Sequence, residues 1–596
     1  MTYQAPVDDI MLSLKSAGRL EEMVAAGHLD GLDQETVRAI VEEAGKFASD
    51  VLDPLNRPGD LAGAQLSDGK VATPEGWQQA YDQFVEGGWA ALPGPARYGG
   101  QGLPETVAMA ACEIWNAANL SFGLCPLLTQ GAIGALLATG SDELKEKYLP
   151  NMIAGAWTGT MNLTEPHAGS DLSLLKTTAT PQDDGTYRLR GTKIYISYGE
   201  HELTENIIHF VLARLPDAPQ GTRGISLFLV PKMMVNDDGS LGARNDVICA
   251  GLEHKMGIHA APTCTMKYGE NDGAVGYLVG EVNRGLNAMF IMMNAARLAV
   301  GVQGVSLADR ATQRATAYAV ERTQGKTPGT AKDAPVDQMV PIIEHADIRR
   351  TLVTMKAMTQ AARTICFATA AAMDRAHGET DDAARQAADQ EAALLTPIAK
   401  AFSTDIGCEV ASMGVQVHGG MGFVEETGAA QYFRDARILP IYEGTNGIQA
   451  IDLVTRKLTM GGGAVLRAYL DDCATTVDDV RASNLPGFGR TADRLASAIA
   501  ATRDSAAWLL ETLPGETDAA LAGATPFLRL FGLTAGTHYL ARAALAASHM
   551  GHDQHEAITL ARVFAETQAS AAEGLQTTIM EGAEGVLQLS PQALAS

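Results

Sequence analysis

The sequence predicts an α+β protein in which an N-terminal helical domain, a central antiparallel β-domain and a second helical bundle are followed by an additional C-terminal helical domain. Two observations predict this fold class. Apolar residues recur at helical spacing toward both ends of the chain, whereas the middle contains short runs rich in β-branched and aromatic residues. The length of 596 residues also favours several domains over one large core.

The first helical domain is expected over residues 1–157. Residues 13–48 and 132–154 carry apolar residues at helical spacing among charges, with Gly, Asp or Pro at the breaks. Residues 93–104, PGPARYGGQGLP, contain too much Gly and Pro for a regular element, so we expect a structured loop there.

The central β-domain is expected over residues 158–282. Turn signals such as Asp184-Gly185 and Asp238-Gly239 separate short runs that are typical of strands. The expected strands are 177–179, 187–189, 193–197, 207–213, 224–230 and 263–268. Their spacing predicts an antiparallel sheet or barrel.

Helical spacing returns in the second bundle, expected over residues 283–460, and continues in the additional domain, expected over 464–596. The expected helices of the bundle are 289–325, 347–377, 381–414 and 447–458. Glycines at 461–463 predict a hinge, and breaks in the last domain are predicted at 484–489 and 514–515. A packed helical bundle accounts for this last domain, and a role in dimerisation or as a lid is a further hypothesis.

The net charge of the chain is −25, from 45 Lys and Arg residues against 70 Asp and Glu residues. This excess of acid disfavours binding to nucleic acid or to an anionic membrane surface, because both require clustered positive charge. No segment has the uninterrupted apolar length of a membrane span, and residues 1–20 lack the pattern of a secretory signal. Seven cysteines without a CxxC pair indicate reduced thiols, a cytoplasmic location and no metal site.

Three segments contain residues suited to a bulky planar ligand. Residues 161–170, MNLTEPHAGS, lead from a strand into a turn with exposed donors, although a plain connecting loop would look the same. Tyr195 and Ser197 lie two residues apart on an expected strand and so share one face, as they would in any half-buried strand. Residues 416–423, QVHGGMGF, end a helix with glycines that allow close backbone approach, but they lack the GxGxxG arrangement of a dinucleotide-binding unit. His418 by itself indicates a packed histidine rather than a catalyst.

Glu443 is the candidate general base. It lies in residues 441–447, IYEGTNG, between an apolar approach and a Gly-Thr-Asn-Gly turn. Apolar surroundings raise the pKa of a carboxyl group because desolvation disfavours its charged form. Many exposed turns also contain Glu, so this segment alone leaves both interpretations open.

Seven segments, taken in order, resemble those of the acyl-CoA dehydrogenase family over most of residues 80–460. They are YGGQGLP, LTEPHAGSD, GTKIYIS, EHKMGIH, YAVERTQGK, QVHGGMGF and RDARILPIYEGT. The resemblance implies the acyl-CoA dehydrogenase fold, FAD as cofactor and α,β-dehydrogenation of an acyl-CoA thioester. The N-terminal YQAPVDDI and the additional helical domain resemble a longer branch that includes the 3-methylthiopropionyl-CoA dehydrogenases of dimethylsulfoniopropionate degradation. That branch implies 3-methylthiopropionyl-CoA as substrate and methylthioacryloyl-CoA as product.

The resemblance also implies roles for individual residues. Glu443 corresponds to the base that removes the proton α to the thioester, whereas Ala296 stands where some branches place that Glu instead. The residues at FAD-binding positions are Met161, Leu163, Thr164, Gly169, Ser170, Tyr195, Ser197, Arg322, Gln324, Gln416, Gly419, Gly420 and Thr445. The residues at substrate-binding positions are Ser170, Asn294 and Arg297. Arg322 and Gln324 correspond to positions that reach the FAD of the neighbouring subunit.

Three positions depart from the family pattern. Tyr195 stands where Trp is common, which changes the ring but keeps a stacking surface. Gly447 stands where Gln is common, so one FAD contact is expected to be missing. Asn294 stands where many members use Asp to bind CoA, which weakens that expectation, whereas Arg297 is retained.

The implied partners are an acyl-CoA substrate and an electron-transfer flavoprotein, with a homodimer or a dimer of dimers as the assembly and no nucleic-acid or membrane partner. Two alternatives lie within the family: a fatty acyl-CoA dehydrogenase of β-oxidation, with short, medium or long chains, and an acyl-CoA oxidase that passes electrons to oxygen. A nucleic-acid-associated relative would need a basic C-terminal face, where this chain is acidic.

Overall fold

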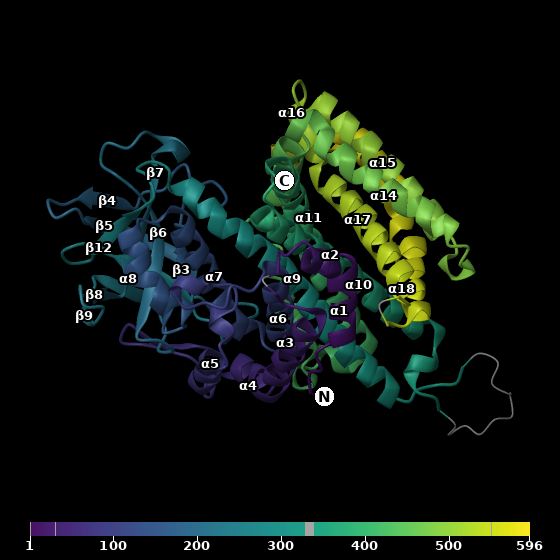
Figure 1. Cartoon of the computed structure of the whole chain (residues 1–596), viewed down its shortest axis with the longest axis horizontal. Coiled ribbons are helices and arrows are strands. Elements are labelled where there is room, and N and C mark those ends of the chain that lie inside the picture. The colour runs from purple at the N-terminus through teal and green to yellow at the C-terminus, as the bar shows by residue number, and fades with distance from the viewer. Residues whose placement is uncertain (1, 30, 328–338, 550) are drawn as a thin grey trace.

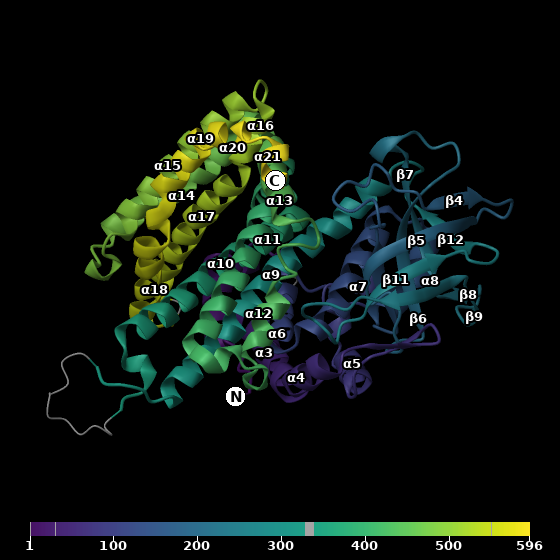
Figure 2. The same ribbon diagram turned by 180° about the vertical axis from the view of Figure 1, so that it is seen from behind.

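The computed structural model describes residues 2–29, 31–327, 339–549 and 551–596. Its centre consists of three long helices, α9 (Gly285–Glu321), α10 (Ala346–Gly378) and α11 (Asp382–His418). The mixed sheet and the C-terminal helices lie on opposite sides of these three helices (Figures 1 and 2). This arrangement confirms the predicted fold class.

The N-terminal region is helical apart from one small hairpin. Its helices are α1 (Val7–Ser16), α2 (Leu20–Ala25), α3 (Gln34–Phe47), α4 (Asp53–Ala62), α5 (Trp77–Glu86), α6 (Glu105–Ala118), α7 (Leu120–Thr139) and α8 (Asp142–Ile153). The hairpin of β1 (Gln65–Ser67) and β2 (Lys70–Ala72) packs Val71 against the core of the sheet. The predicted loop at 93–104 is confirmed and contains a short turn at Ala96–Tyr98. The sequence pattern does not predict α6, because every residue from 106 to 118 is buried and no polar stripe marks an outer face.

The central region contains a mixed sheet. Its strands are β3 (Trp157–Asn162), β4 (Thr178–Pro181), β5 (Tyr187–Ser197), β6 (Asn206–Arg214), β7 (Ile225–Pro231), β8 (Met233–Val235), β9 (Leu241–Arg244), β10 (Val247–Leu252), β11 (Thr263–Tyr268) and β12 (Ala274–Val279). The main sheet has the order β10-β11-β5-β12-β7-β6-β3, with β4 beside β5 and β6. Most neighbours pair antiparallel as predicted, but β6 pairs in parallel with β3 and with the first residue of β4. The intervening residues 163–205 provide the long crossover that a parallel pair requires. Of β3 the sequence predicts only the end, at residue 161, because all its residues are buried and its polarity does not alternate.

The three central helices pack closely through glycines of α9. A Cβ at Gly304 would lie 2.3 Å from the carbonyl oxygen of Ser403 on α11, so only glycine permits this approach. Two short helices, α12 (Ala429–Ala436) and α13 (Asn446–Asp452), follow α11. The predicted helices of this region are present, although α9 ends at Glu321 and α11 extends to His418.

The C-terminal helices begin after a sharp turn at the predicted hinge, where all three glycines at 461–463 have positive φ. The helices are α14 (Ala464–Ala482), α15 (Thr491–Thr512), α16 (Thr517–Ala522), α17 (Ala524–Ala546), α18 (Gln554–Thr567), α19 (Ala572–Glu581), α20 (Ala583–Gln588) and α21 (Pro591–Ala595). Both predicted breaks in this region fall between helices. Arg529 of α17 forms a bidentate pair with Glu409 of α11 at 2.8 and 3.0 Å, and the apolar cores of the two regions are continuous.

Within the described ranges, two helices are long and apolar enough to cross a membrane, α7 and α9. The apolar windows of these helices are 78% and 72% buried inside the protein. Such burial is typical of core helices, because a lipid-facing helix would leave its apolar side chains on the surface.

Candidate active site

Glu443 lies in a tight turn before α13. Its φ is +54°, so the backbone occupies the left-handed region that is unfavourable for a residue with a Cβ. The N–H of Asn446 closes the turn by donating to the carbonyl of Pro440 at 2.9 Å. In the part of the chain that the structure describes, the backbone N–H of Glu443 donates to no protein acceptor. A strained backbone with a free donor is typical of a functional site.

A buried lysine of α11 clamps this turn. The Nζ of Lys400 donates to the carbonyl of Leu439 and to Oδ1 of Asn446, each at 2.8 Å. The amide nitrogen of Asn446 in turn donates to the Ala401 carbonyl at 3.1 Å and to Oδ1 of Asp405 at 2.8 Å. Lys400 is fully buried, so its ammonium group has no water to replace these partners. The clamp therefore fixes the position of the turn relative to α11.

The electrostatics of this turn suit proton transfer near neutral pH. Burial raises the pKa of Glu443 to about 7, while the positive charges of Lys400 and Arg297 act in the opposite direction. Burial also lowers the pKa of Lys400 to about 7, against the effect of the Glu443 charge. Because a general base works best when its pKa is close to the working pH, Glu443 has the protonation behaviour of a base for neutral conditions.

Arg297 on α9 acts on the same turn. Its Nη1 donates to Oδ1 of Asn294 at 3.2 Å and lies 3.9 Å from Oδ2 of Asp452. Among the described residues, the buried Nε of Arg297 and the buried Oε1 of Gln449 on α13 have no partner. An unpaired donor and an unpaired acceptor are groups that a polar ligand would satisfy. The structure thus brings the predicted Asn294 and Arg297 into one site with Glu443.

A buried ion pair in the β-domain shapes residues 161–170. Lys193 donates through Nζ to Oε1 of Glu165 and to the carbonyl of Leu163, each at 2.9 Å. Glu165 also accepts a hydrogen bond from the backbone N–H of Thr177 at 3.0 Å. Both charged side chains are nearly inaccessible to solvent, so the pair ties this loop firmly to β5.

Tyr195 and Ser197 lie on β5 beside that loop, where the N–H of Ile194 donates to the carbonyl of Thr164 at 3.0 Å. Simple alternation along the strand, which we expected, does not hold here. The pairing of β5 with β11 shifts at a bulge, and Tyr195 has φ +61°. The Tyr195 side chain is 60% exposed. Within the described residues, the hydroxyl groups of Thr164, Ser170 and Ser197 have no hydrogen-bond partner, so an open aromatic surface adjoins unused polar groups.

Of the other predicted cofactor residues, Met161 lies on β3, Leu163 and Gly169 lie in the loop after it, Thr445 caps α13 beside Glu443, and five lie elsewhere, where α9 and α11 end. The rings of Tyr318 and His418 stack with centroids 4.5 Å apart and join the two helix ends. His418 is buried with Nδ1 2.7 Å from the Gly414 carbonyl, so it is a packed histidine as predicted. The predicted residues at this place are Arg322, Gln324, Gln416, Gly419 and Gly420. In the described part of one chain, no hydrogen bond or ion pair joins them to Tyr195 or Glu443.

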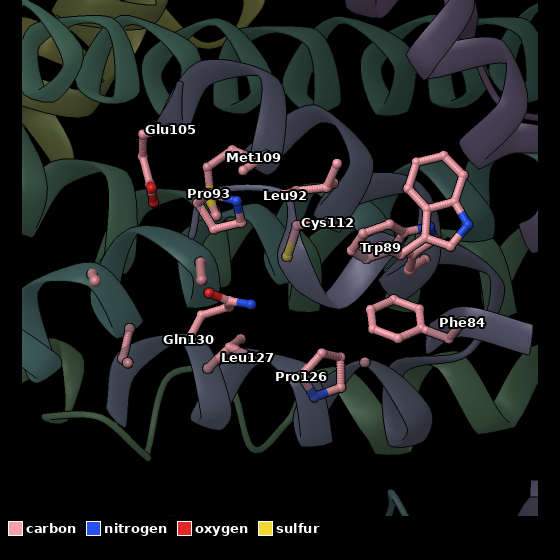
Figure 3. A pocket seen from close by; sticks show the side chains of 17 residues that line it. Phe84, Trp89, Leu92, Pro93, Glu105, Met109, Cys112, Pro126, Leu127 and Gln130 are labelled. Atoms are coloured by element: carbon pink, nitrogen blue, oxygen red, sulfur yellow. The ribbon is translucent and has the colours of Figure 1, made fainter. Parts of the chain in front are cut away.

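A cavity of about 70 Å³ lies between α6, α7 and α9, and the sequence did not predict it. Figure 3 places Glu105 and Gln130 toward one end of this cavity and Phe84 toward the other. Its wall includes Ala296, which precedes Arg297. The lining side chains are mostly apolar and include Phe84, Trp89, Leu92, Met109, Cys112, Trp115, Pro126 and Leu127. The cavity is therefore a small apolar space next to the helix that carries Arg297.

Four family models match this chain and cover most of it. They describe the acyl-CoA dehydrogenase N-terminal domain at residues 34–156, middle domain at 160–270 and C-terminal domain at 283–458, and an acetyl-CoA dehydrogenase C-terminal-like domain at 469–590. The chain belongs to the acyl-CoA dehydrogenase family. It is an oxidoreductase that dehydrogenates acyl-CoA thioesters with FAD as cofactor.

Individual relatives cover nearly the whole chain. The 3-methylmercaptopropionyl-CoA dehydrogenase of Ruegeria pomeroyi is 50% identical over 549 residues, 92% of each chain. Caenorhabditis elegans ACDH-11, solved in complex with C11-CoA, has a TM-score of 0.76 at 20% identity, over 97% of this chain and 96% of that chain. An acyl-CoA dehydrogenase of Bacillus anthracis, solved with FAD, has a TM-score of 0.73 at 21% identity, over 96% and 93%. The two structures show that the fold extends through the additional helices.

The residues present fit FAD. An isoalloxazine ring needs a flat apolar surface beside hydrogen-bonding groups, and the exposed Tyr195 ring next to the free hydroxyls of Ser197 and Thr164 provides both. At the second place, a Cβ added to Gly419 or Gly420 would meet no atom within 4 Å, which leaves room for a bulky group against the backbone.

Several residues that shape the site were not singled out from the sequence. Lys400 interrupts the apolar run LLTPIAKAF of α11, and a lysine among buried helix positions is a usable signal for a buried polar contact. Lys193 and Glu165 lie within recognised motifs, but only their pairing across the β-domain shows that they hold the loop. Trp89 and Cys112 carry no local signal, because the cavity forms between helices that are separate in sequence.

Proposed function

We propose that Glu443 removes the proton from the carbon α to the thioester of a bound acyl-CoA. One observation carries this assignment: the same residue combines a carboxyl group whose pKa is raised to about 7 with a backbone N–H that has no acceptor among the described residues. The carboxylate would take the proton while the N–H donates to the thioester oxygen, where negative charge develops. Lys400 holds both groups in place through its clamp on the turn.

FAD, when bound, accepts the hydride that leaves the β-carbon of the substrate. The chain provides the surfaces that bind and orient it. Residues that would hold FAD within one subunit are Met161, Leu163, Thr164, Gly169, Ser170, Tyr195, Ser197 and Thr445. Residues at the second place, which would hold the cofactor between subunits, are Arg322, Gln324, Gln416, Gly419 and Gly420. Ser170, Asn294 and Arg297 would bind the acyl-CoA.

The proposed substrate is 3-methylthiopropionyl-CoA, oxidised to methylthioacryloyl-CoA as a step of dimethylsulfoniopropionate degradation. The relative that is 50% identical over 92% of the chain supports this choice. The size of the cavity also supports this choice. An apolar cavity of about 150 Å³ holds one benzene molecule, so the cavity of about 70 Å³ in this protein accommodates roughly three heavy atoms. Its aromatic wall suits a thioether, since sulfur makes favourable contacts with aromatic ring edges.

The proposal extends to the assembly and its partners. Phe423, next to the second cofactor place, is 89% exposed, and Met421 is 47% exposed. Exposed apolar side chains of this kind mark interaction surfaces, which supports a homodimer or a dimer of dimers. The family resemblance supports an electron-transfer flavoprotein as acceptor, and the seven cysteines without a CxxC pair support a cytoplasmic location. The four domains remain predicted at 1–157, 158–282, 283–460 and 464–596.

The test is anaerobic reduction of the flavin by a panel of substrates. The purified protein should be yellow and should bleach fastest with 3-methylthiopropionyl-CoA among butyryl-, isobutyryl-, octanoyl- and palmitoyl-CoA. A preference for palmitoyl-CoA would contradict the proposed substrate and indicate a β-oxidation enzyme. In air without another acceptor, hydrogen peroxide formed as fast as substrate is lost would instead indicate an oxidase.

A further inference from the structure

The cavity next to α9 and a groove on the outer surface share part of their walls. The groove lies between α3 and α5, has a volume of about 800 Å³ and includes the charged side chains of Glu43 and Lys46 among its lining residues. Trp89 and Leu92 line both the cavity and the groove. These two residues therefore separate a small apolar space inside the protein from a much larger space outside it.

Trp89 stands at the end of the cavity farther from the site, and Leu92 lies between Pro93 and Trp89 (Figure 3). Gln130 marks the opposite end in Figure 3, and its neighbour Gly131 packs against Met292 of α9, five residues before Arg297. Trp89 instead packs on Trp115, with ring centroids 5.5 Å apart, and Trp115 packs on Phe84 at 5.0 Å. Trp89 thus belongs to the aromatic cluster at the far end.

Trp89 is held there by a short segment whose backbone is fixed from outside, because the amide nitrogen of Gln130 donates to the Ala90 carbonyl at 2.6 Å and the N–H of Gln101 donates to the Ala91 carbonyl at 2.9 Å. It begins a single 3₁₀ turn, Trp89–Ala91, directly after Gly88, which has φ +75°. Its ring contacts Phe47 of α3 on the groove side at a centroid distance of 6.5 Å. The side chain is half-buried, whereas Leu92 is buried. The groove begins behind these two side chains, and Phe47 lines it next to Trp89.

We propose that Trp89, with Leu92, sets the upper limit on acyl chain length by closing the far end of the acyl cavity against the surface groove. This inference rests on the proposed function, because it takes the cavity as the space that receives the acyl tail. The wall limits the tail to the few atoms that the cavity holds. Removing it joins the two spaces, and a longer tail then passes between the helices into the groove.

The experiment compares variants of the holoenzyme on saturated acyl-CoA substrates from butyryl to dodecanoyl. Trp89→Ala and Leu92→Ala open the wall. Leu127→Ala enlarges the cavity alone, and Ile40→Ala alters the groove alone, since each of these residues lines only one of the two spaces. Each buried methylene contributes about a fourfold change in binding, and octanoyl has four more methylenes than butyryl, so an opened wall should raise the octanoyl-to-butyryl ratio of kcat/KM by up to about 250-fold.

The two controls show how much of the change in chain-length preference comes from opening the wall. Leu127→Ala should shift the optimum by only one or two carbons, and Ile40→Ala should keep the wild-type profile. Thermal melting identifies any variant that does not fold, and Trp89→Leu then provides a milder opening of the same wall. Folded Trp89→Leu and Leu92→Ala proteins that keep the wild-type chain-length profile would overturn the proposal. Wild-type protein that no acyl-CoA reduces would instead overturn the proposed function.

Discussion

The turn that carries Glu443 and the surface around Tyr195 differ in how far the protein itself satisfies their polar groups. In the turn, Lys400 and Asn446 bind neighbouring backbone and side-chain groups, and the geometry is fixed by the chain itself. Around Tyr195 the support is rigid, because Lys193 and Glu165 hold the loop, but the outer face has an exposed ring and free hydroxyls.

This difference separates the group that the protein positions before any ligand binds from the surface that a ligand must complete. A base must be held in one position before substrate arrives, since small misplacements slow proton transfer greatly. A cofactor surface must stay open, because its partners come from the ligand. We therefore expect substitutions in the turn to affect chemistry and substitutions on the open face to affect cofactor binding.

The largest effect is expected for Glu443→Gln. The amide keeps the size of the side chain but cannot accept the α-proton, so the rate of flavin reduction should fall by several orders of magnitude, at least about 10²–10⁴-fold. FAD content, read from the visible spectrum, should stay at the wild-type level. Rapid reduction in this variant would show that another group is the base.

Lys400→Met should reduce both stability and activity while FAD stays bound. The Leu439 carbonyl and Oδ1 of Asn446 lose their donor inside the protein, which costs about 1–3 kcal/mol of unfolding free energy. The looser turn should lower kcat/KM by about 10–100-fold. Chemical denaturation and steady-state kinetics measure the two effects.

The matched control for Lys400 is Lys46→Met, because Lys46 is 66% exposed and its ion pair with Glu43 lies on the surface. That variant should behave as the wild type. Equal stability and activity in Lys400→Met would contradict a clamp.

The pH dependence of kcat/KM should report the ionisation of Glu443 in the turn, because the groups around Tyr195 that face the cofactor are uncharged hydroxyls and an aromatic ring. Because burial raises the pKa of Glu443 to about 7, the carboxyl group carries a proton at lower pH and cannot act as base. The value of kcat/KM should therefore rise through pH 7, with about a tenfold loss for each unit below it.

The same profile tests the link to Lys400. The positive charge of Lys400 lowers the pKa of Glu443, so Lys400→Met should move the inflection to higher pH. An inflection near pH 4 in the wild type would contradict a desolvated carboxyl group.

The smallest effect is expected for Tyr195→Ser. Losing a stacking surface should weaken FAD binding by about tenfold or less. The melting temperature of the apoprotein should not change, because the ring is 60% exposed and supports little of the core. Titration of apoprotein with FAD measures the first effect, and unchanged affinity would show that the ring does not contact the cofactor.

The order of helical and β regions, the loop at 93–104 and the glycine hinge could be predicted from local pattern, because each depends on spacing or on Gly and Pro. The extent of strand β3 and the helix α6 could not, since complete burial removes the alternation or the stripe that prediction uses. Glu443 could be proposed as the base from its turn and motif, whereas the bulge at Tyr195 depends on the register with β11, which no single strand encodes.

The sequence by itself determined the family, the fold class and the candidate base, because motifs in a fixed order constrain all three. Only the tertiary structure decided that Lys400 clamps the turn, that the cavity is short and that Trp89 closes it. These properties arise from contacts between segments far apart in the chain, and the distance between such segments is set by packing rather than by spacing along the sequence.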